Sequence, residues 1–388
     1  MGRFRDALAG PGLAAIAEIK RRSPSAGELR PGADPAELAA GFASAGAAAV
    51  SVLVDERFGG SLVDLEAARG ATDLPLLGKG FFSRPEELLE LERAGADAVL
   101  LLLRDLDDAQ AVELHRHAAQ LGLDALVEAH DAAELERAAR LGADPIGINA
   151  RDLTSFAIDR SSQLDLVAQS HNLPSAPVIV AESGIHSRGQ AAAAELAGAS
   201  AILVGSALMT AADPAAKLAE LLARPLVKVC GLTRQEDVDA AAEFGADMAG
   251  FVLARESPRQ AERVLPVPDG MLSVAVLVEE RRVVAADLVQ LYRREDGHRS
   301  RDAVLLRGER EVARVVDLPW QEDDPLHLER ARSVQGRVML AGRLSPENVR
   351  AAIEAVKPWA VDASSSLEVS PGIKDHERVR AFVEAVRQ

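Results

Sequence analysis

Short apolar runs alternate with helix-like stretches over the first 222 residues of the chain. Eight mostly apolar runs can be distinguished, at 14–20, 48–54, 74–79, 97–103, 124–130, 145–150, 177–183 and 201–206. Between them lie segments rich in Ala, Glu, Leu and Arg, such as 85–94 and 132–141, both followed by Gly-Ala-Asp. The Gly is a natural helix C-cap. Apolar strands alternating with helices predict a parallel sheet covered by helices, and eight repeats in about 220 residues predict a (βα)8 barrel.

A second, shorter series of apolar runs follows residue 225. Its predicted strands are 227–231, 248–253, 271–278, 302–308, a less certain 312–320, 337–342 and 359–364. Six or seven strands are fewer than eight, and the segment is shorter than the roughly 200 residues of a small barrel. The polar stretch 292–301 (YRREDGHRSR) and the acidic 321–324 are predicted to be loops.

These patterns predict an α/β protein of two TIM-type (βα)8 barrels in tandem. The expected domains are residues 1–222 and 227–388, joined by a linker at 223–226. The second barrel is predicted to be shortened, and an incomplete barrel is an open alternative.

Composition narrows the class of function. The net charge of −16 argues against a nucleic-acid partner, which needs clustered Lys and Arg. A single cysteine, Cys230, excludes an intramolecular disulfide and fits a reducing compartment. No run reaches the ~20 apolar residues of a membrane helix. We therefore expect a cytoplasmic protein with no membrane partner, and a monomer whose two domains pack together.

Polar residues stand at the carboxyl ends of six of the first eight predicted strands, where barrel enzymes carry their reactive groups. They are Glu18, Lys20, Lys79, Glu128, Asn149, Glu182, Ser183, Gly205 and Ser206. One Lys or Glu in such a place is more often a solvated rim residue or a filler inside the barrel. Polar residues at six matching strand ends are harder to explain in that way. The set contains no Cys/His cluster, so we expect no metal.

Two glycine-serine turns suggest a phosphate site. Glu-Ser-Gly-Ile at 182–185 follows the seventh predicted strand, and Val-Gly-Ser-Ala-Leu at 204–208 follows the eighth. Backbone amides and a hydroxyl before a helix can hold a phosphate, and the loops after strands 7 and 8 are its usual place in barrels. Gly in tight turns and Ser at N-caps are also common where no phosphate binds, so each turn alone is weak evidence for a phosphate site.

Six motifs in the first half resemble, in order, those of indole-3-glycerol-phosphate synthases. They are AEIKRRSPSAGEL (17–29), VSVLVDERFGGS (50–61), LVEAH (126–130), GINARDL (147–153), VAESGI (180–185) and VGSALM (204–209). The resemblance implies a (βα)8-barrel lyase that closes the indole ring of 1-(o-carboxyphenylamino)-1-deoxyribulose 5-phosphate with loss of CO2 and water. Such an enzyme needs no cofactor, and its partners are small phosphorylated molecules.

The same resemblance implies roles for individual residues. Lys79 would be the general acid at the ribulose carbonyl, Lys20 would bind the leaving carboxylate, and Glu128 would act in the proton transfers of dehydration. Glu18 would orient and tune a lysine. Asn149 and Glu182 would position the substrate and the intermediate. The implied substrate- and phosphate-binding residues are Ser23, Phe81, Arg151, Ser183, Gly184, Gly205 and Ser206.

One departure from the family pattern surrounds the lysine. The family usually has Lys-Asp-Phe preceded by a larger residue, whereas this chain has Gly78-Lys79-Gly80-Phe81. Two glycines are expected to loosen the backbone that aims Lys79.

The second half resembles phosphoribosylanthranilate isomerases, which make the substrate of the first half. The motifs are VKVCGLTRQED (227–237), GADMAGFVLARESPR (245–259), LAGRLSPENV (340–349) and VDASSSLEVSPGIKD (361–375). The resemblance implies Cys230 as general base and makes Asp317 the only plausible acid. It implies substrate or phosphate binding by Arg259, Gly342, Asp362 and Ser364. A lone Cys can equally be a small buried apolar residue.

Several isomerase features are missing. The glycine-rich loop that should follow the acid is not found, and Asp317 could equally end the fifth strand or stand in a turn. Arg343 and Ser366 replace glycines of the family pattern. We therefore expect an impaired isomerase, and a non-catalytic structural domain remains the alternative. More distant alternatives are a histidine-pathway isomerase, which would use paired aspartates, and a non-enzymatic binding protein.

Overall fold

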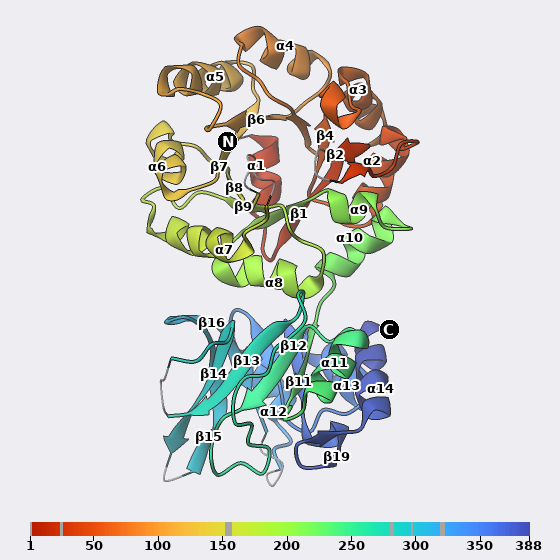
Figure 1. The fold of residues 1–388 in the computed structure, drawn as a ribbon, viewed down its shortest axis with the longest axis vertical. Coiled ribbons are helices and arrows are strands. Elements are labelled where there is room, and N and C mark those ends of the chain that lie inside the picture. The colour runs from red at the N-terminus through yellow and green to blue at the C-terminus, as the bar shows by residue number, and fades with distance from the viewer. Residues whose placement is uncertain (1, 24–25, 152–156, 280–282, 296–297, 319–322) are drawn as a thin grey trace. The chain divides into compact units, whose positions relative to one another are not determined.

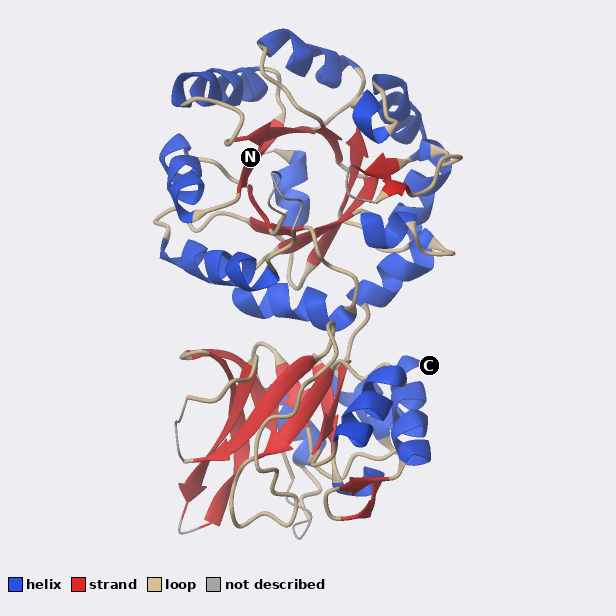
Figure 2. Cartoon of the chain, viewed as in Figure 1, coloured by secondary structure: helices blue, strands red, loops and turns tan. Residues whose placement is uncertain are grey.

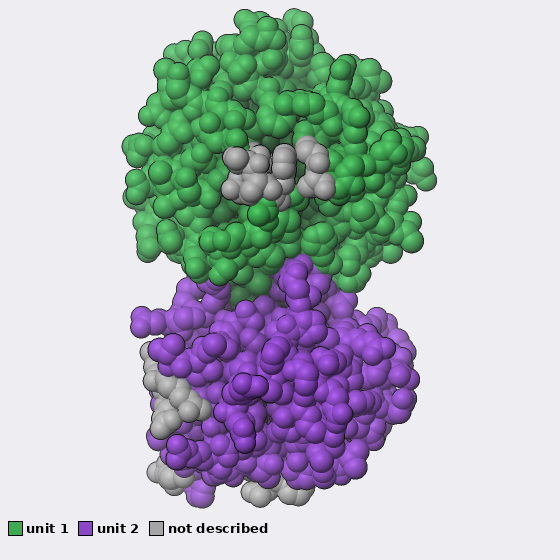
Figure 3. Space-filling view, in the orientation of Figure 1, with its two compact units in different colours: residues 1–186, 191–222 green, residues 187–190, 223–388 purple. Residues whose placement is uncertain are grey.

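The computed structural model describes residues 2–23, 26–151, 157–279, 283–295, 298–318 and 323–388. Two compact units make up the chain, residues 1–186 with 191–222 and residues 187–190 with 223–388 (Figure 3). In the described part of the chain, none of the helices has both the length and the apolar character needed to span a membrane.

The first unit is a closed barrel of eight parallel strands (Figure 1). The strands are β1 (Ala14–Ile19), β4 (Ala49–Leu53), β5 (Leu76–Lys79), β6 (Ala98–Leu102), β7 (Asp124–Ala129), β8 (Ile146–Asn149), β9 (Ile179–Glu182) and β10 (Ala201–Val204). The helices that follow them are α2 (Pro35–Ser44), α3 (Leu62–Ala71), α4 (Pro85–Arg93), α5 (Asp108–Gln120), α6 (Ala132–Leu141), α7 (Arg160–Gln169), α8 (Arg188–Ala197), and α9 (Ser206–Met209) with α10 (Pro214–Leu222). The predicted (βα)8 barrel is confirmed.

Local sequence signals set the helix ends. The side chain of Asp131 caps α6 by accepting a hydrogen bond from the backbone N–H of Glu134 at 2.8 Å. Gly142 ends the same helix with a φ of 73°, a left-handed conformation that favours glycine. The Gly-Ala-Asp sequence therefore ends the helix and leads into the next strand.

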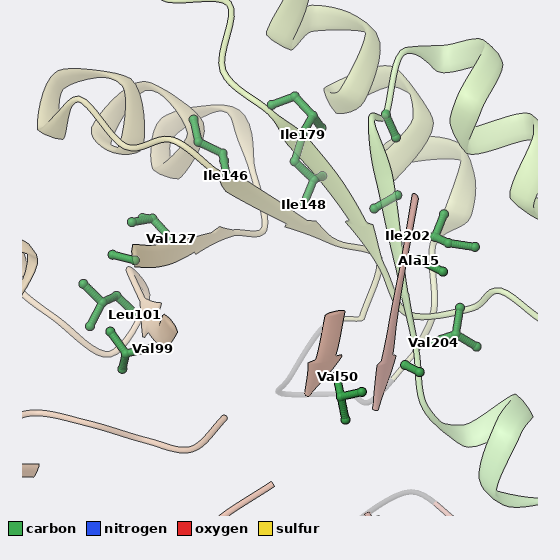
Figure 4. Close-up of a cluster of buried hydrophobic side chains, with 14 of the residues drawn as sticks. Ala15, Val50, Val99, Leu101, Val127, Ile146, Ile148, Ile179, Ile202 and Val204 are labelled. Carbon is green, nitrogen blue, oxygen red and sulfur yellow. The ribbon is translucent and has the colours of Figure 1, made fainter. Parts of the chain in front are cut away.

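Alternation along the strands separates two apolar layers. Ala15, Val50, Val127 and Ile179 belong to the layer that packs against the surrounding helices (Figure 4). Neighbouring positions such as Ile16 form a second cluster inside the barrel, together with Ala49, Leu77, Leu100, Leu126, Val180 and Leu203. Since side chains alternate along a strand, the next inward positions lie at the carboxyl ends, where the polar residues stand.

Helix α1 (Arg3–Leu8) closes the opposite end of this barrel. Phe4 and Leu8 are fully buried in the inner cluster. The backbone N–H of Arg5 donates to the carboxylate of Asp124 at 3.0 Å, at the first residue of β7. The helix therefore lies at the amino ends of the strands.

Replacing Phe4 by Ala should destabilise the first unit. The change removes a fully buried aromatic side chain and leaves a cavity, which costs about 3–5 kcal/mol of unfolding free energy. Urea unfolding monitored by circular dichroism measures the loss. Val63→Ala is the control, because Val63 is an exposed apolar residue whose truncation should change stability by less than about 0.5 kcal/mol. Equal urea unfolding midpoints for the two variants would show that burial of α1 at the amino ends of the strands does not stabilise the first unit.

The second unit is also a closed barrel of eight strands, but its sheet is mixed. The strands are β11 (Leu226–Cys230), β12 (Met248–Val252), β13 (Leu272–Val278), β14 (Leu288–Glu295), β15 (His298–Arg307), β16 (Arg310–Val316), β17 (Val338–Leu340) and β18 (Ala360–Ala363). β15 runs antiparallel to both β14 and β16, and the other neighbouring pairs are parallel. The helices are α11 (Gln235–Glu243), α12 (His327–Ser333), α13 (Val349–Val356) and α14 (His376–Arg387).

The prediction of two barrels in tandem is therefore confirmed, whereas the count of six or seven strands is wrong and the alternative of an incomplete second barrel is excluded. Residues 292–301, predicted to be a loop, form the end of β14 and the start of β15 in their described part (Figure 2). Residues 296–297 and 319–322 lie outside the described residues, so the predicted strand end at 320 and part of the predicted loop 321–324 are not described. Three strands joined as a meander close the barrel with fewer residues than three strand–helix repeats would need.

Candidate active sites

The inward-facing positions at the carboxyl ends of the first barrel bring the predicted polar residues together. Glu18, Lys79, Glu128 and Glu182 each lie two residues beyond an apolar residue of the inner cluster. Strand register adds Asn149, which is paired with Glu182 across β8 and β9. The alternation that builds the core thus also aims these side chains into the barrel mouth.

An ion-pair chain links the two lysines. Lys20 Nζ lies 2.7 Å from Glu18 Oε1, and Lys79 Nζ lies 3.2 Å from Glu18 Oε2. On its other side, Lys79 donates to Glu182 Oε2 at 2.8 Å. Lys79 is therefore held between two carboxylates, and Glu18 bridges both ammonium groups.

The charges at this mouth stabilise one another. Burial by itself would raise the pKa of Glu18, but Lys20 and Lys79 outweigh it and lower the pKa to about 2. Burial would lower the pKa of Lys79, but Glu182, Glu18 and Glu128 raise it above its ordinary value. Lys79 therefore stays an ammonium group across the physiological range.

The other two carboxylates have opposite shifts. Burial would raise the pKa of Glu128, but His130, Lys79 and the amide of Asn149, 3.0 Å away, lower it overall. Burial and the neighbouring Glu128 raise the pKa of Glu182, and Lys79 only partly opposes them. At neutral pH Glu128 is ionised, whereas Glu182 is the carboxyl that more readily carries a proton.

A cavity of about 370 Å³ opens at this mouth. Its lining includes most of the predicted first-domain site residues: Glu18, Lys20, Lys79, Phe81, Glu128, Asn149, Arg151, Ser183, Gly184, Gly205 and Ser206. Glu182 lies behind them, bonded to Lys79. Ser23 is buried beside the lining residue Ala26, whose N–H donates to its hydroxyl at 3.2 Å, but Ser23 itself does not line the cavity.

Part of the cavity lining is apolar, and the sequence predicted only one of its residues, Phe81. Phe81 is 39% exposed and stacks on Phe58, with ring centroids 6.2 Å apart. Ile158 and Leu53 also line the cavity. Sequence reasoning missed Phe58, Ile158 and Leu53 because single apolar residues in or beside loops carry no periodic signal. A flat aromatic group fits against such a wall.

Backbone turns also line the cavity. Ser183 and Gly184 both have a φ of 70°, and a side chain on Gly184 would meet Ile158. A side chain on Gly205 would come within 2.2 Å of Glu18 Oε1 and 2.9 Å of Lys20 Nζ. Glycine therefore lets both loops approach the cavity closely, as an anion-binding turn requires.

The two glycines around Lys79 have packing reasons. A Cβ on Gly78 would lie 2.5 Å from Leu91 of α4, and one on Gly80 would lie 2.8 Å from the Phe82 ring. Close helix and ring packing therefore accounts for both, and Lys79 is fixed by its ion pairs.

Replacing Gly147 by Ala should impair the site with little effect on folding. A Cβ there would lie 2.2 Å from Glu182 Oε1, so the Glu182 carboxylate, which bonds to Lys79, must shift. A displacement of about 1 Å can cost about 100-fold in rate. Turnover and thermal unfolding would be measured beside Gly70→Ala on α3, where an added Cβ meets nothing within 4 Å. Full activity of Gly147→Ala would mean that the position of Glu182 is unimportant.

The second barrel has its own cavity, of about 500 Å³. All six predicted second-domain site residues line it: Cys230, Arg259, Asp317, Gly342, Asp362 and Ser364. The cavity is also lined by Gln290, Tyr292 and Arg299 of the meander, which the sequence reasoning missed. In the sequence, Asp-Gly at 296–297 is typical of a two-residue hairpin turn. This dipeptide could have predicted that the residues on its two sides form paired strands.

Cys230 lies among buried charges at the end of β11. Lys228, fully buried, donates to Asp362 Oδ2 and Gln290 Oε1, both at 2.7 Å. Burial raises the pKa of the Cys230 thiol, and Lys228 only partly opposes it. The thiol is therefore mostly protonated at neutral pH, which makes it a weak base at rest.

Asp317 directly follows β16, the sixth strand of this barrel. Its Oδ2 accepts hydrogen bonds from the Tyr292 hydroxyl at 2.8 Å and from Arg299 at 3.0 Å, and its Oδ1 accepts from the N–H of Leu318. In all three contacts Asp317 is an acceptor. A proton-donating role requires these contacts to rearrange.

Arg343 and Ser366, which replace glycines of the isomerase pattern, lie in the part of the chain that the structure describes. Arg343 has a φ of 55°, in the left-handed region where glycine is favoured. The Ser366 hydroxyl donates to the carbonyl of Leu344. Nearby, Lys374 and Arg259 both bond to Glu368, at 2.8 Å in each case.

Comparisons with known proteins identify the family of the first domain. The model of the family "Indole-3-glycerol phosphate synthase" matches residues 2–221, more than half of the chain. The chain belongs to this family. An indole-3-glycerol phosphate synthase from Streptomyces griseus is 47% identical over 218 residues, which cover 56% of this chain and 80% of that protein. One from a Nocardioides species is 48% identical over 215 residues, which cover 55% and 80%.

The second domain matches a different family model. The model of N-(5'-phosphoribosyl)anthranilate isomerase matches residues 325–385. A crystal structure of a Thermotoga maritima phosphoribosylanthranilate isomerase is 29% identical, covers 42% of this chain and 99% of its own, and has a TM-score of 0.32. The chain is therefore an enzyme of tryptophan biosynthesis that joins a lyase domain to a domain with an isomerase match.

Proposed function

We propose that the cavity of the first barrel closes the indole ring of 1-(o-carboxyphenylamino)-1-deoxyribulose 5-phosphate. The observation that carries this proposal is the pair of lysines bridged by Glu18 at one barrel mouth. The substrate has a carbonyl that must gain a proton and a carboxylate that must leave, and one ammonium group suits each. The apolar wall of Phe58 and Phe81 suits the aromatic ring, and the turns at Gly184 and Gly205 suit the phosphate.

The proposed sequence of steps begins at Lys79. The ring carbon that bears the carboxylate attacks the ribulose carbonyl, and Lys79 gives a proton to the carbonyl oxygen as the C–C bond forms. Lys20 holds the carboxylate until it leaves as CO2, which returns its electron pair to the ring. Glu128, already ionised, takes a proton from the carbon beside the nitrogen and passes it to the hydroxyl, which leaves as water. Asn149 and Glu182 hold the substrate and intermediate through hydrogen bonds.

The test is direct. The purified chain is given the carboxyphenylamino-deoxyribulose phosphate, and the indole product is followed by its fluorescence. We expect product formation in the wild type and a loss of at least about 100-fold in Glu128→Gln, which keeps the shape but removes the base. No product from the folded wild-type chain would refute the proposal.

For the second barrel we propose a weak phosphoribosylanthranilate isomerase. Its support is that Cys230 and Asp317, from strands β11 and β16, line one cavity with Asp362. The proposed base is Cys230 and the proposed acid is Asp317. The protonated thiol and the acceptor contacts of Asp317 are the reasons to expect slow turnover. A non-catalytic domain is the alternative.

We further propose that the enzyme is a cytoplasmic monomer acting on small phosphorylated molecules. The single cysteine and the acidic composition support this. Sedimentation equilibrium would test it, and a mass of twice 41.0 kDa would contradict it.

A further inference from the structure

His130 is a titratable residue beside the first site to which the proposed mechanism gives no role. It follows β7 directly, between that strand and the N-cap of α6. Glu134, in the first turn of α6, accepts the backbone N–H of His130 at 2.8 Å and contacts its ring Nδ1 at 3.1 Å, both through Oε2. One carboxylate therefore fixes both the backbone and the ring of His130.

The other ring nitrogen is at ion-pair distance from the proposed base, without the alignment of a hydrogen bond. His130 Nε2 lies 3.2 Å from Glu128 Oε1, the oxygen that also accepts from Asn149. A histidine held at Nδ1 by a carboxylate presents its Nε2 in one fixed direction. Glu134, His130 and Glu128 thus form a chain from the α6 helix to the reactive mouth.

The charged groups at the mouth show why Glu128 needs a cation nearby. Among the described residues at this mouth, three buried carboxylates, Glu18, Glu128 and Glu182, lie close to two lysines, Lys20 and Lys79, and Arg151 also lines the cavity. Both lysines contact Glu18, and Lys79 also bonds to Glu182. Glu128 feels Lys79 only through space, and His130 is the cation at ion-pair distance from it among the described residues. A buried carboxylate without a close cation tends to take up a proton.

We propose that His130, kept as an imidazolium by Glu134, is a positioning residue that holds Glu128 ionised and thereby makes it the base of the reaction. It also decides where a shared proton resides, because no histidine of the described ranges is at ion-pair distance from the neighbouring carboxyl, Glu182. This inference rests on the proposed lyase function of the same site.

The direction of the pKa shift of His130 agrees with its contacts to Glu128 and Glu134. Burial would lower the pKa of His130, but Glu128 and Glu134 outweigh it and raise the pKa to about 10. The groups that face Glu128 are His130, Lys79, Asn149 and Glu182, and the groups that face His130 are Glu128 and Glu134. Because the folded pKa of His130 is raised, its stabilising charge is fully present below the ordinary histidine pKa and is lost as the pH rises through about 10.

The first experiment observes the charge of His130 without any turnover. The full chain is labelled at its histidine ring carbons and titrated by NMR, and His130→Gln identifies the resonance. We expect the ring to remain charged at about pH 8.5, where an ordinary imidazole with a pKa of about 6.5 is neutral. Glu134→Gln should bring the titration down toward ordinary values. A His130 that titrates at about pH 6.5 or below in the wild type would overturn the proposal.

The second experiment separates positioning from a merely structural role. In His130→Gln the acid limb of the kcat–pH profile should move up by about one pH unit or more, because Glu128 loses its nearby cation. KM should change little, since His130 does not line the cavity. His130→Lys keeps a cation and should move the limb back. A uniform loss of rate at every pH, with the limb in place, would overturn the proposal.

His115→Gln is the matched control. His115 lies on α5 within the same unit, and burial alone lowers its pKa. This variant should leave the acid limb unchanged. If the wild-type chain makes no indole product at all, the proposed lyase function fails, whereas the NMR titration still decides whether His130 is an imidazolium.

Discussion

Replacing Lys79 by Met should abolish indole-ring closure while leaving the chain folded. Met keeps most of the side-chain volume but removes the ammonium group that lies 2.8 Å from Glu182 and 3.2 Å from Glu18. Loss of a positioned proton donor costs about 10²–10⁴-fold in rate. The fall should appear in kcat, because Lys79 acts on the carbonyl as its charge develops. Single-turnover fluorescence of the indole product measures it.

Lys217→Met is the control for this variant. Lys217 lies on α10 and pairs only with Glu220 of the same helix among its described contacts, at 3.0 Å. Its replacement should leave turnover within about twofold of the wild type, since an exposed helical pair contributes little. Product formation by Lys79→Met at more than about a tenth of the wild-type rate would show that another group supplies the proton.

Replacing Cys230 by Ser should remove whatever isomerase turnover the second barrel has. Burial raises the pKa of the thiol, so only a few per cent at most is thiolate at neutral pH. Wild-type turnover of phosphoribosylanthranilate should therefore be slow and should rise with pH toward the raised thiol pKa. Serine ionises far less readily, and the rate should fall by about 100-fold or more across that range.

Each of the two variants, Lys79→Met and Cys230→Ser, serves as the experimental control for the other. Cys230→Ser should retain lyase turnover, and Lys79→Met should retain isomerase turnover, because each residue lines a different cavity. An isomerase rate that does not depend on Cys230 would remove the proposed base. If the wild-type chain shows no consumption of phosphoribosylanthranilate at any pH, the second barrel is a structural domain.

Much of the first barrel could be predicted from sequence because its signals are local and repeated. Each strand is a short apolar run, helices such as α6 have caps like Asp131 and Gly142, and the strand–helix repeat occurs eight times. Where a run ends in a polar residue, alternation alone points that side chain into the mouth, as at Glu128 and Glu182.

The second barrel was predicted less well because three of its strands lack these signals. β14, β15 and β16 form a meander without helices in the described part of the chain, and their exposed halves are as polar as loops. Tyr292 and Arg299 reach the cavity only because antiparallel pairing brings β14 and β15 together. Register between strands is a tertiary property, so periodicity could not reveal it.

By itself the sequence determined the strand–helix repeat of the first barrel, the family resemblance of both halves and most residues at the two mouths. Only the tertiary structure decided that the second barrel closes with eight strands, that Gly78 serves the packing of Leu91, and that His130 lies between two carboxylates. The physical reason is distance along the chain. Caps and periodicity act over a few residues, whereas closure, ion pairing and pKa shifts depend on groups brought together by the whole fold.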